Sequence, residues 1–200
     1  MSLVILGVGV LAFVEAQQSF VDANSWSTHA ATGTFLCNEL REFTRRFPRH
    51  DRVTGLFFQG SGASAVLTGW GRETGEVAVS DLDDLDDLDG LRFGVDGDFA
   101  GPINAFGDVI FDLDANGNPD MDEESRVPLR GWFQQIIVEK VDPSDNATVR
   151  ADNYWVPAVG GVPARNVDRF PLRVTIIAEY QGPYDAEARE ISRVSWIVPP

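Results

Sequence analysis

The spacing of a twelve-residue calcium loop recurs in five oxygen-bearing side chains, those of Asp112, Asp114, Asn116, Asp120 and Glu123. Oxygens at such positions converge on one cation, Gly117 permits the sharp turn between them, and Glu123 closes the cage with both carboxylate oxygens. Asn118 is expected to contribute its backbone carbonyl. The sequence therefore predicts calcium as the cofactor, with the ligands Asp112, Asp114, Asn116, Asn118, Asp120 and Glu123.

This loop departs from an EF-hand in two ways. Pro119 stands where an EF-hand usually has a branched apolar residue, and the flanking segments do not read as paired helices. We therefore expect a calcium loop within a β-rich domain. A solvated acidic turn, rich in Asp, Asn and Gly, is the alternative interpretation.

A second acidic segment, DLDDLDDLDG at residues 81–90, places a leucine at every third position. One interpretation is a helical turn or two with the leucines on one side. Another is a source of further calcium ligands, from Asp84, Asp86, Asp87 or Asp89. The interpretation that the composition favours is a solvated acidic edge, held down by its leucines.

Composition excludes several other classes of function. The chain carries 31 acidic and 16 basic residues, a net charge of −15, which argues against a nucleic-acid partner. Cys37 is the only cysteine, so an internal disulfide is excluded, and we expect its side chain to be packed rather than reactive. The only histidines, His29 and His50, suggest no catalytic triad, and paired carboxylates mean little among so many acids. We expect no enzymatic activity.

The chain begins with an apolar run from Leu3 to Val14 that ends abruptly at Glu15. The run is compatible with a buried core helix or with the remainder of a longer segment whose start lies before Met1. It makes a poor secretory signal, because no basic residue precedes it and the following residues are a poor cleavage site. As written it is shorter than the roughly 20 apolar residues that span a bilayer. Helical character continues to Phe47, because the next proline is Pro48 and one apolar stripe is formed by Leu36, Leu40, Phe43 and Phe47.

Beyond residue 51, short apolar runs alternate with glycine and proline. Strands are predicted over 76–79, 132–141, 172–180 and 191–198, the last three with the period-two pattern of a half-buried antiparallel sheet. The predicted fold is α+β, a long N-terminal helix packed on a mostly antiparallel sheet. Two parts are expected: a hydrophobic and amphipathic N-terminal helix over residues 1–50 and an acidic, β-rich globular domain over residues 51–200.

SLVILGVGVLAF followed by a long polar helix and a β-rich body resembles the type IV pilin-like proteins, which include the pseudopilins of type II secretion. The resemblance covers about the second half of the prepilin-type N-terminal motif, whose leader, processing glycine, N-methylated phenylalanine and glutamate have no counterparts here. It implies a pilin-like fold and an assembly and membrane helix. The residues of that helix are Leu3, Val4, Ile5, Leu6, Val8, Val10, Leu11, Phe13 and Val14.

The resemblance also implies a function. The chain is expected to be a non-enzymatic, minor subunit of a type IV pilus or type II secretion pseudopilus. Its partners are expected to be other pilin-like subunits, after a membrane-bound stage. The implied location is a single-pass inner-membrane protein with an exported globular domain, then a cell-surface or periplasmic filament. The alternative is an exported calcium-dependent binding domain with an ordinary anchor or signal, or a secreted one.

Overall fold

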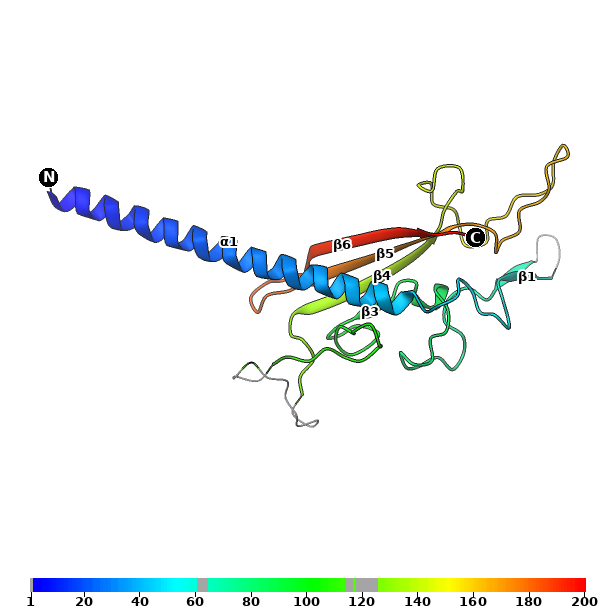
Figure 1. Ribbon diagram of the computed structural model, residues 1–200, viewed down its shortest axis with the longest axis horizontal. Helices are drawn as coiled ribbons and strands as arrows, with labels where there is room; N and C mark the ends of the chain where they lie inside the picture. The colour runs from blue at the N-terminus through cyan, green and yellow to red at the C-terminus, as the bar shows by residue number, and fades with distance from the viewer. Residues whose placement is uncertain (1, 61–64, 114–116, 118–125) are drawn as a thin grey trace.

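The fold is α+β, with one long helix at the N-terminus and antiparallel sheets after it, as predicted (Figure 1). The computed structural model describes residues 2–60, 65–113, 117 and 126–200. Its elements are α1 (Ser2–Thr44), β1 (Phe57–Gln59), β2 (Val66–Thr68), the 3-10 turn η2 (Asp86–Leu88), β3 (Arg92–Phe93), β4 (Trp132–Lys140), β5 (Leu172–Tyr180) and β6 (Arg189–Val198).

Strands β3, β4, β5 and β6 form a four-stranded antiparallel sheet in that order, and β1 pairs with β2 in a separate ribbon. In the main sheet Ile136 lies opposite Ile176, and Ile176 lies opposite Val194. The alternating pattern of β4 places its buried side chains on the face that meets α1, because successive side chains of a strand point to opposite faces. The centre of β5 is buried on both faces, with Thr175 and Ile177 covered as well.

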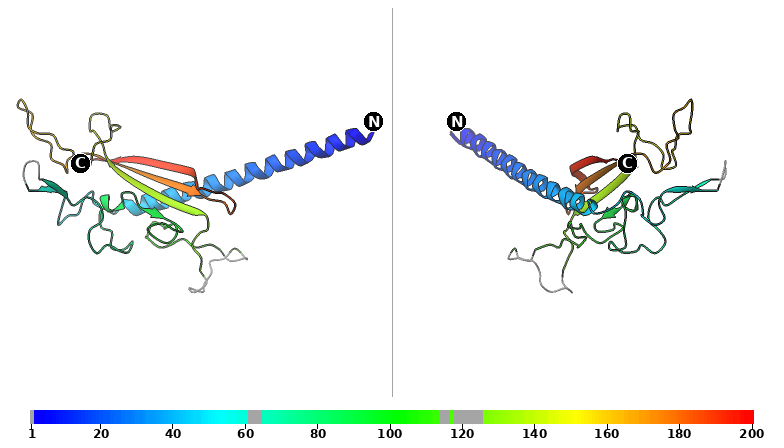
Figure 2. Two further views of the ribbon diagram at one scale, coloured as in Figure 1. Left: turned by 180° about the vertical axis from the view of Figure 1, so that it is seen from behind. Right: turned by 45° about the vertical axis from the view of Figure 1, so that its right-hand side comes forward.

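The C-terminal half of α1 lies across this sheet, and its N-terminal half extends well beyond it (Figures 1 and 2). The predicted stripe of Leu36, Leu40 and Phe43 is fully buried against the sheet, and Phe47 packs beside it after the helix has ended. Cys37 is also buried, with its thiol near the carbonyl of Ser192 at 3.5 Å. The expectation that this cysteine is packed is therefore confirmed, and burial raises the pKa of its thiol.

Helix and sheet approach each other closely at Gly33. A Cβ atom added there would lie 2.9 Å from Cγ2 of Ile191 and 3.3 Å from Cβ of Ser192. We expect Gly33→Val to lower the free energy of unfolding by about 1–3 kcal/mol, because the branched side chain must displace β6 or the helix. Urea unfolding of the full chain measures this change.

The control for Gly33 is Ala31→Val, at an exposed position of the same helix. It should cost only the lower helix propensity of valine, less than about 0.7 kcal/mol. Equal losses in the two variants would show that the close helix–sheet approach contributes nothing to stability.

Two predictions are wrong. The location in the membrane through a single-pass helix is contradicted, since no helix among the described residues combines the length and the apolar character needed to cross a bilayer. The apolar run of α1 stops at Glu15, well short of a bilayer's thickness. Residues 76–79 form turns and not a strand, because the Asp81 carboxylate accepts the N–H groups of Val77 and Ala78 that a sheet ladder would use.

Candidate functional site

The projecting half of α1 is a helical rod with an apolar surface open to solvent. Val10, Leu11, Phe13 and Val14 are each more than half exposed, and farther along Phe20 is 75% exposed. The side chains of Leu3, Val4, Ile5, Leu6 and Val8 lie outside the described residues. Large apolar groups exposed along one element are typical of an interaction surface.

The rod leaves the body at His29. The imidazole ring of His29 lies 4.2 Å from the ring of Tyr180 and 5.8 Å from the ring of Trp132, centroid to centroid. These two aromatic residues are opposite each other at the ends of β4 and β5, so both strands hold the helix at this point. Beyond it toward the N-terminus, the described side chains of α1 are exposed.

The acidic segment 81–90 folds into a compact turn around η2. Its three leucines, Leu82, Leu85 and Leu88, are buried in the main core, as their spacing predicts. However, the carboxylates between them are not solvated, because Asp84, Asp86 and Asp87 are buried as well. The favoured interpretation of a solvated acidic edge is therefore wrong for this part of the segment.

Backbone N–H groups orient the buried carboxylates. Oδ1 of Asp84 accepts the N–H groups of Asp86 and Asp87, at 2.9 and 3.1 Å. Oδ2 of Asp87 accepts the N–H groups of Asp83 and Asp84, both at 3.1 Å. The turn is thus closed by its own side chains, which fixes the direction of each carboxylate.

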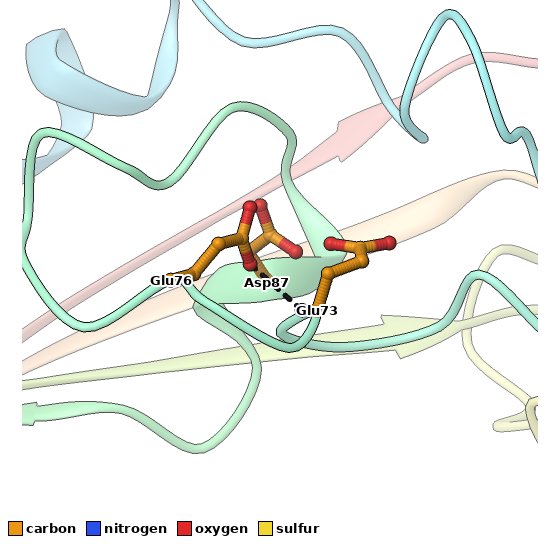
Figure 3. Close-up of side chains that lie close together, drawn as sticks. All are labelled: Glu73, Glu76 and Asp87. Atoms are coloured by element: carbon orange, nitrogen blue, oxygen red, sulfur yellow. Dashed lines mark hydrogen bonds between the residues drawn. The ribbon is translucent and has the colours of Figure 1, made fainter.

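Three carboxylates from two segments converge at this turn. Glu73 and Glu76 lie on the loop that crosses η2, and Asp87 lies on η2 itself (Figure 3). Each offers an oxygen within 4.8 Å of the others, an arrangement that could hold a metal ion, and Asp83, Asp84 and Asp87 form a second such group. Oε2 of Glu76 accepts the Glu73 N–H at 2.8 Å, while Oδ1 of Asp87 is buried with no hydrogen-bond partner.

Crowding and burial disfavour the charged forms of these acids. Burial, followed by the charges of Asp87 and Glu76, raises the pKa of Glu73 to about 8. Burial and a hydrogen bond with Asp86 raise the pKa of Asp84 to about 8. Each site therefore favours a bound proton or another cation at neutral pH.

A buried pair, His50 and Asp86, lies on the other side of η2. Nδ1 of His50 is 2.8 Å from Oδ1 of Asp86, and the Gly71 N–H reaches the other carboxylate oxygen at 3.3 Å. Burial lowers the pKa of His50 to about 4 and raises that of Asp86 to about 7. Because Nε2 of His50 is buried without a partner, we interpret the contact as a neutral imidazole donating its Nδ1–H to the carboxylate.

The only lysine lies close to this pair. Lys140 is fully buried, its ammonium donates to the carbonyl of Asp152, and it lies 5.6 Å from the ring centroids of Trp70 and Phe170. Burial lowers its pKa to about 8. The sequence did not predict the contact between His50 and Asp86 or the burial of Lys140, because neither follows from local spacing.

Comparisons with protein-family models, with curated proteins and with solved structures find no match to this chain. The pilin-like assignment stays a prediction. Of the predicted calcium ligands, the structure describes only the side chain of Asp112, which lies 3.1 Å from Nε of Arg130. The others, Asp114, Asn116, Asn118, Asp120 and Glu123, lie outside the described residues.

Proposed function

We propose that this chain is a non-enzymatic subunit of a pilin-like filament, in which the projecting half of α1 packs against the same helix of neighbouring copies. The observation that carries the proposal is the exposed apolar surface at Val10, Leu11, Phe13 and Val14. In water such a surface is unfavourable by roughly 25 cal/mol per Å² of apolar area, and bundling of helices removes it from solvent. The sheet domain then lies on the outside of the bundle.

The way the helix is docked supports this arrangement. Among the described side chains of α1, the buried ones all lie in its C-terminal half, so the rod can engage other copies without unfolding the body. Among the described rod positions, apolar and uncharged polar residues predominate between Val10 and Thr28. Helices of this composition can approach one another closely without burying many charges.

The proposal keeps calcium as the cofactor at residues 112–123. The structure adds one constraint there, because the Asp112 carboxylate is 3.1 Å from Arg130 and also 3.4 Å from the Arg130 backbone nitrogen. Calcium at this loop requires Asp112 to exchange its arginine partner for the ion. The Asp114→Ala/Glu123→Ala variant removes two of the predicted ligands and serves as a comparison below.

Replacing exposed apolar side chains of the rod by charged ones should weaken assembly. Leu11→Glu/Val14→Glu replaces two exposed apolar side chains, and we expect it to raise the concentration needed for assembly at least about tenfold, since each buried apolar side chain contributes roughly 1.5–3 kcal/mol. Sedimentation velocity and negative-stain electron microscopy of the full chain measure filament formation.

The matched control adds the same charge at polar positions of the rod, Gln17→Glu/Asn24→Glu. It should assemble at nearly the concentration of the unchanged protein. An unchanged chain that remains monomeric at every concentration, or a charged Leu11/Val14 variant that assembles as readily as the control, would contradict the proposed function.

A further inference from the structure

One buried oxygen atom next to η2 lacks the partner that such atoms normally have. Asp87 is 1% exposed, its Oδ2 accepts two backbone N–H groups, and its Oδ1 accepts none. Buried carboxylate oxygens in folded proteins are almost always paired, because an unpaired one has lost its water without replacement. The free oxygen of Asp87 therefore requires a partner, which is either a proton on the neighbouring Glu73 carboxyl or a bound cation.

The surroundings of this oxygen are acidic. Glu73, Glu76 and Asp87 each bring one carboxylate oxygen within 4.8 Å of the others, and Figure 3 shows the three groups close together. Asp87 also belongs to the second acidic group, with Asp83 and Asp84. Like charges at such separations repel strongly in a poorly solvated place. A bound cation would reduce this repulsion and would also provide a partner for the free oxygen of Asp87.

The ligand chemistry selects the kind of cation. Glu73, Glu76 and Asp87 offer only carboxylate oxygens, the ligands of hard ions such as calcium and magnesium. Magnesium requires a nearly ideal octahedron, whereas calcium accepts irregular sets of six to eight oxygens completed by carbonyls and water. Two of the three ligands come from a loop, an irregular set that suits calcium better.

We propose that Glu73, Glu76 and Asp87 form a calcium-binding site, distinct from the loop at residues 112–123 and independent of assembly through α1. Glu76 and Asp87 are held in position by backbone N–H groups through one oxygen each, which leaves the second oxygen for the ion. The bound ion ties the loop around residues 73–76 to η2. The loop is thereby held against η2, whose Leu88 is part of the core.

The sharpest test uses Asp87→Asn in the full chain. Asparagine keeps an oxygen for the N–H groups of Asp83 and Asp84, and it turns an amide N–H toward the glutamates. In a chelator we expect this variant to melt at a higher temperature than the unchanged protein, because the repulsion is gone. Added calcium should raise the melting temperature of the unchanged protein. The rise should be smaller in the variant, because the variant lacks this site.

Isothermal titration with calcium chloride provides the second measurement. Glu73→Gln/Glu76→Gln changes two half-buried residues at the surface of the site and should fold normally. We expect it to lose one bound calcium, or to bind that ion at least about tenfold more weakly, because affinity follows the number of charged ligands. Glu187→Gln, at an exposed acid elsewhere, is the matched control and should bind as the unchanged protein does.

The comparison variant Asp114→Ala/Glu123→Ala separates the two sites. It should retain the calcium that Glu73→Gln/Glu76→Gln loses. The proposal is overturned if the unchanged protein binds no calcium, or if Asp87→Asn and Glu73→Gln/Glu76→Gln both bind calcium with unchanged number and affinity. It is also overturned if the Asp114→Ala/Glu123→Ala variant binds no calcium at all, because the loop at residues 112–123 would then hold every bound ion.

Discussion

Phe43→Ala is expected to lower the free energy of unfolding by about 3–5 kcal/mol, which is a large part of the stability of a domain of this size. Phe43 is fully buried in the last turns of α1. Its ring lies 5.1 Å from that of Phe47 and 4.2 Å below the guanidinium of Arg46, and Gly107 packs against its edge. Truncation leaves a cavity beside the Gly107 backbone and the Phe47 ring, and such a cavity adds to the lost burial of the side chain.

The same substitution in the rod should have little effect on a monomer. Phe20→Ala removes an equal volume from a side chain that is 75% exposed, and we expect a change below about 0.5 kcal/mol. Urea unfolding followed by circular dichroism, at concentrations below assembly, compares the two variants. Similar losses for Phe43 and Phe20 would mean that the helix is not docked through its C-terminal half.

Gln134→Leu should lower the free energy of unfolding by about 2–4 kcal/mol, although it makes the core more apolar. The fully buried Gln134 side chain accepts the Ile103 N–H at 2.8 Å and donates to the carbonyls of Leu36 and Ile103, at 2.8 and 3.1 Å. One amide thus connects α1, β4 and the loop before residue 110. Leucine has a similar volume but leaves the Ile103 backbone groups buried without this partner.

Gln135→Leu is the matched control for Gln134, because it makes the same chemical change one position along β4 on the partly exposed face. Its effect should stay within about 0.5 kcal/mol. Thermal unfolding of both variants at one pH measures the two changes in stability. A Gln134 variant as stable as the control would show that the Ile103 backbone groups find other partners.

The regular elements were predictable because their patterns are local. Leu36, Leu40 and Phe43 recur at helical spacing, and the alternation of 172–180 is typical of a strand, so the helix and three strands of the main sheet, β4, β5 and β6, follow from the sequence. The short strand β3 was not predicted. The error at residues 76–79 has a local cause too. The Asp81 carboxylate captures the N–H groups of Val77 and Ala78, and neither β propensity nor alternation reports such competition.

The acidic site was only partly predictable. The sequence named Asp87 among possible calcium ligands, since it lies in a run of acids. The convergence of Glu73 and Glu76 on Asp87 depends on how a loop without regular structure crosses η2, which no periodicity encodes. Burial of Asp84, Asp86 and Asp87 was missed for a related reason. An acidic residue is expected to be solvated when only the composition is considered. Here backbone N–H groups and His50 are the hydrogen-bond partners of these buried carboxylates.

The length of the projecting helix has an electrostatic consequence. From Ser2 to Thr28 the rod spans about 40 Å, at roughly 1.5 Å per residue. Each copy carries a net charge of −15, and repulsion between exposed charges decays over a screening length of about 8 Å at physiological ionic strength. If copies overlap only near the N-terminal ends of their rods, a rod five screening lengths long keeps the acidic bodies beyond the range of one another's charges. Apolar association along the rod and electrostatic repulsion between the bodies would then act at different places on one helix.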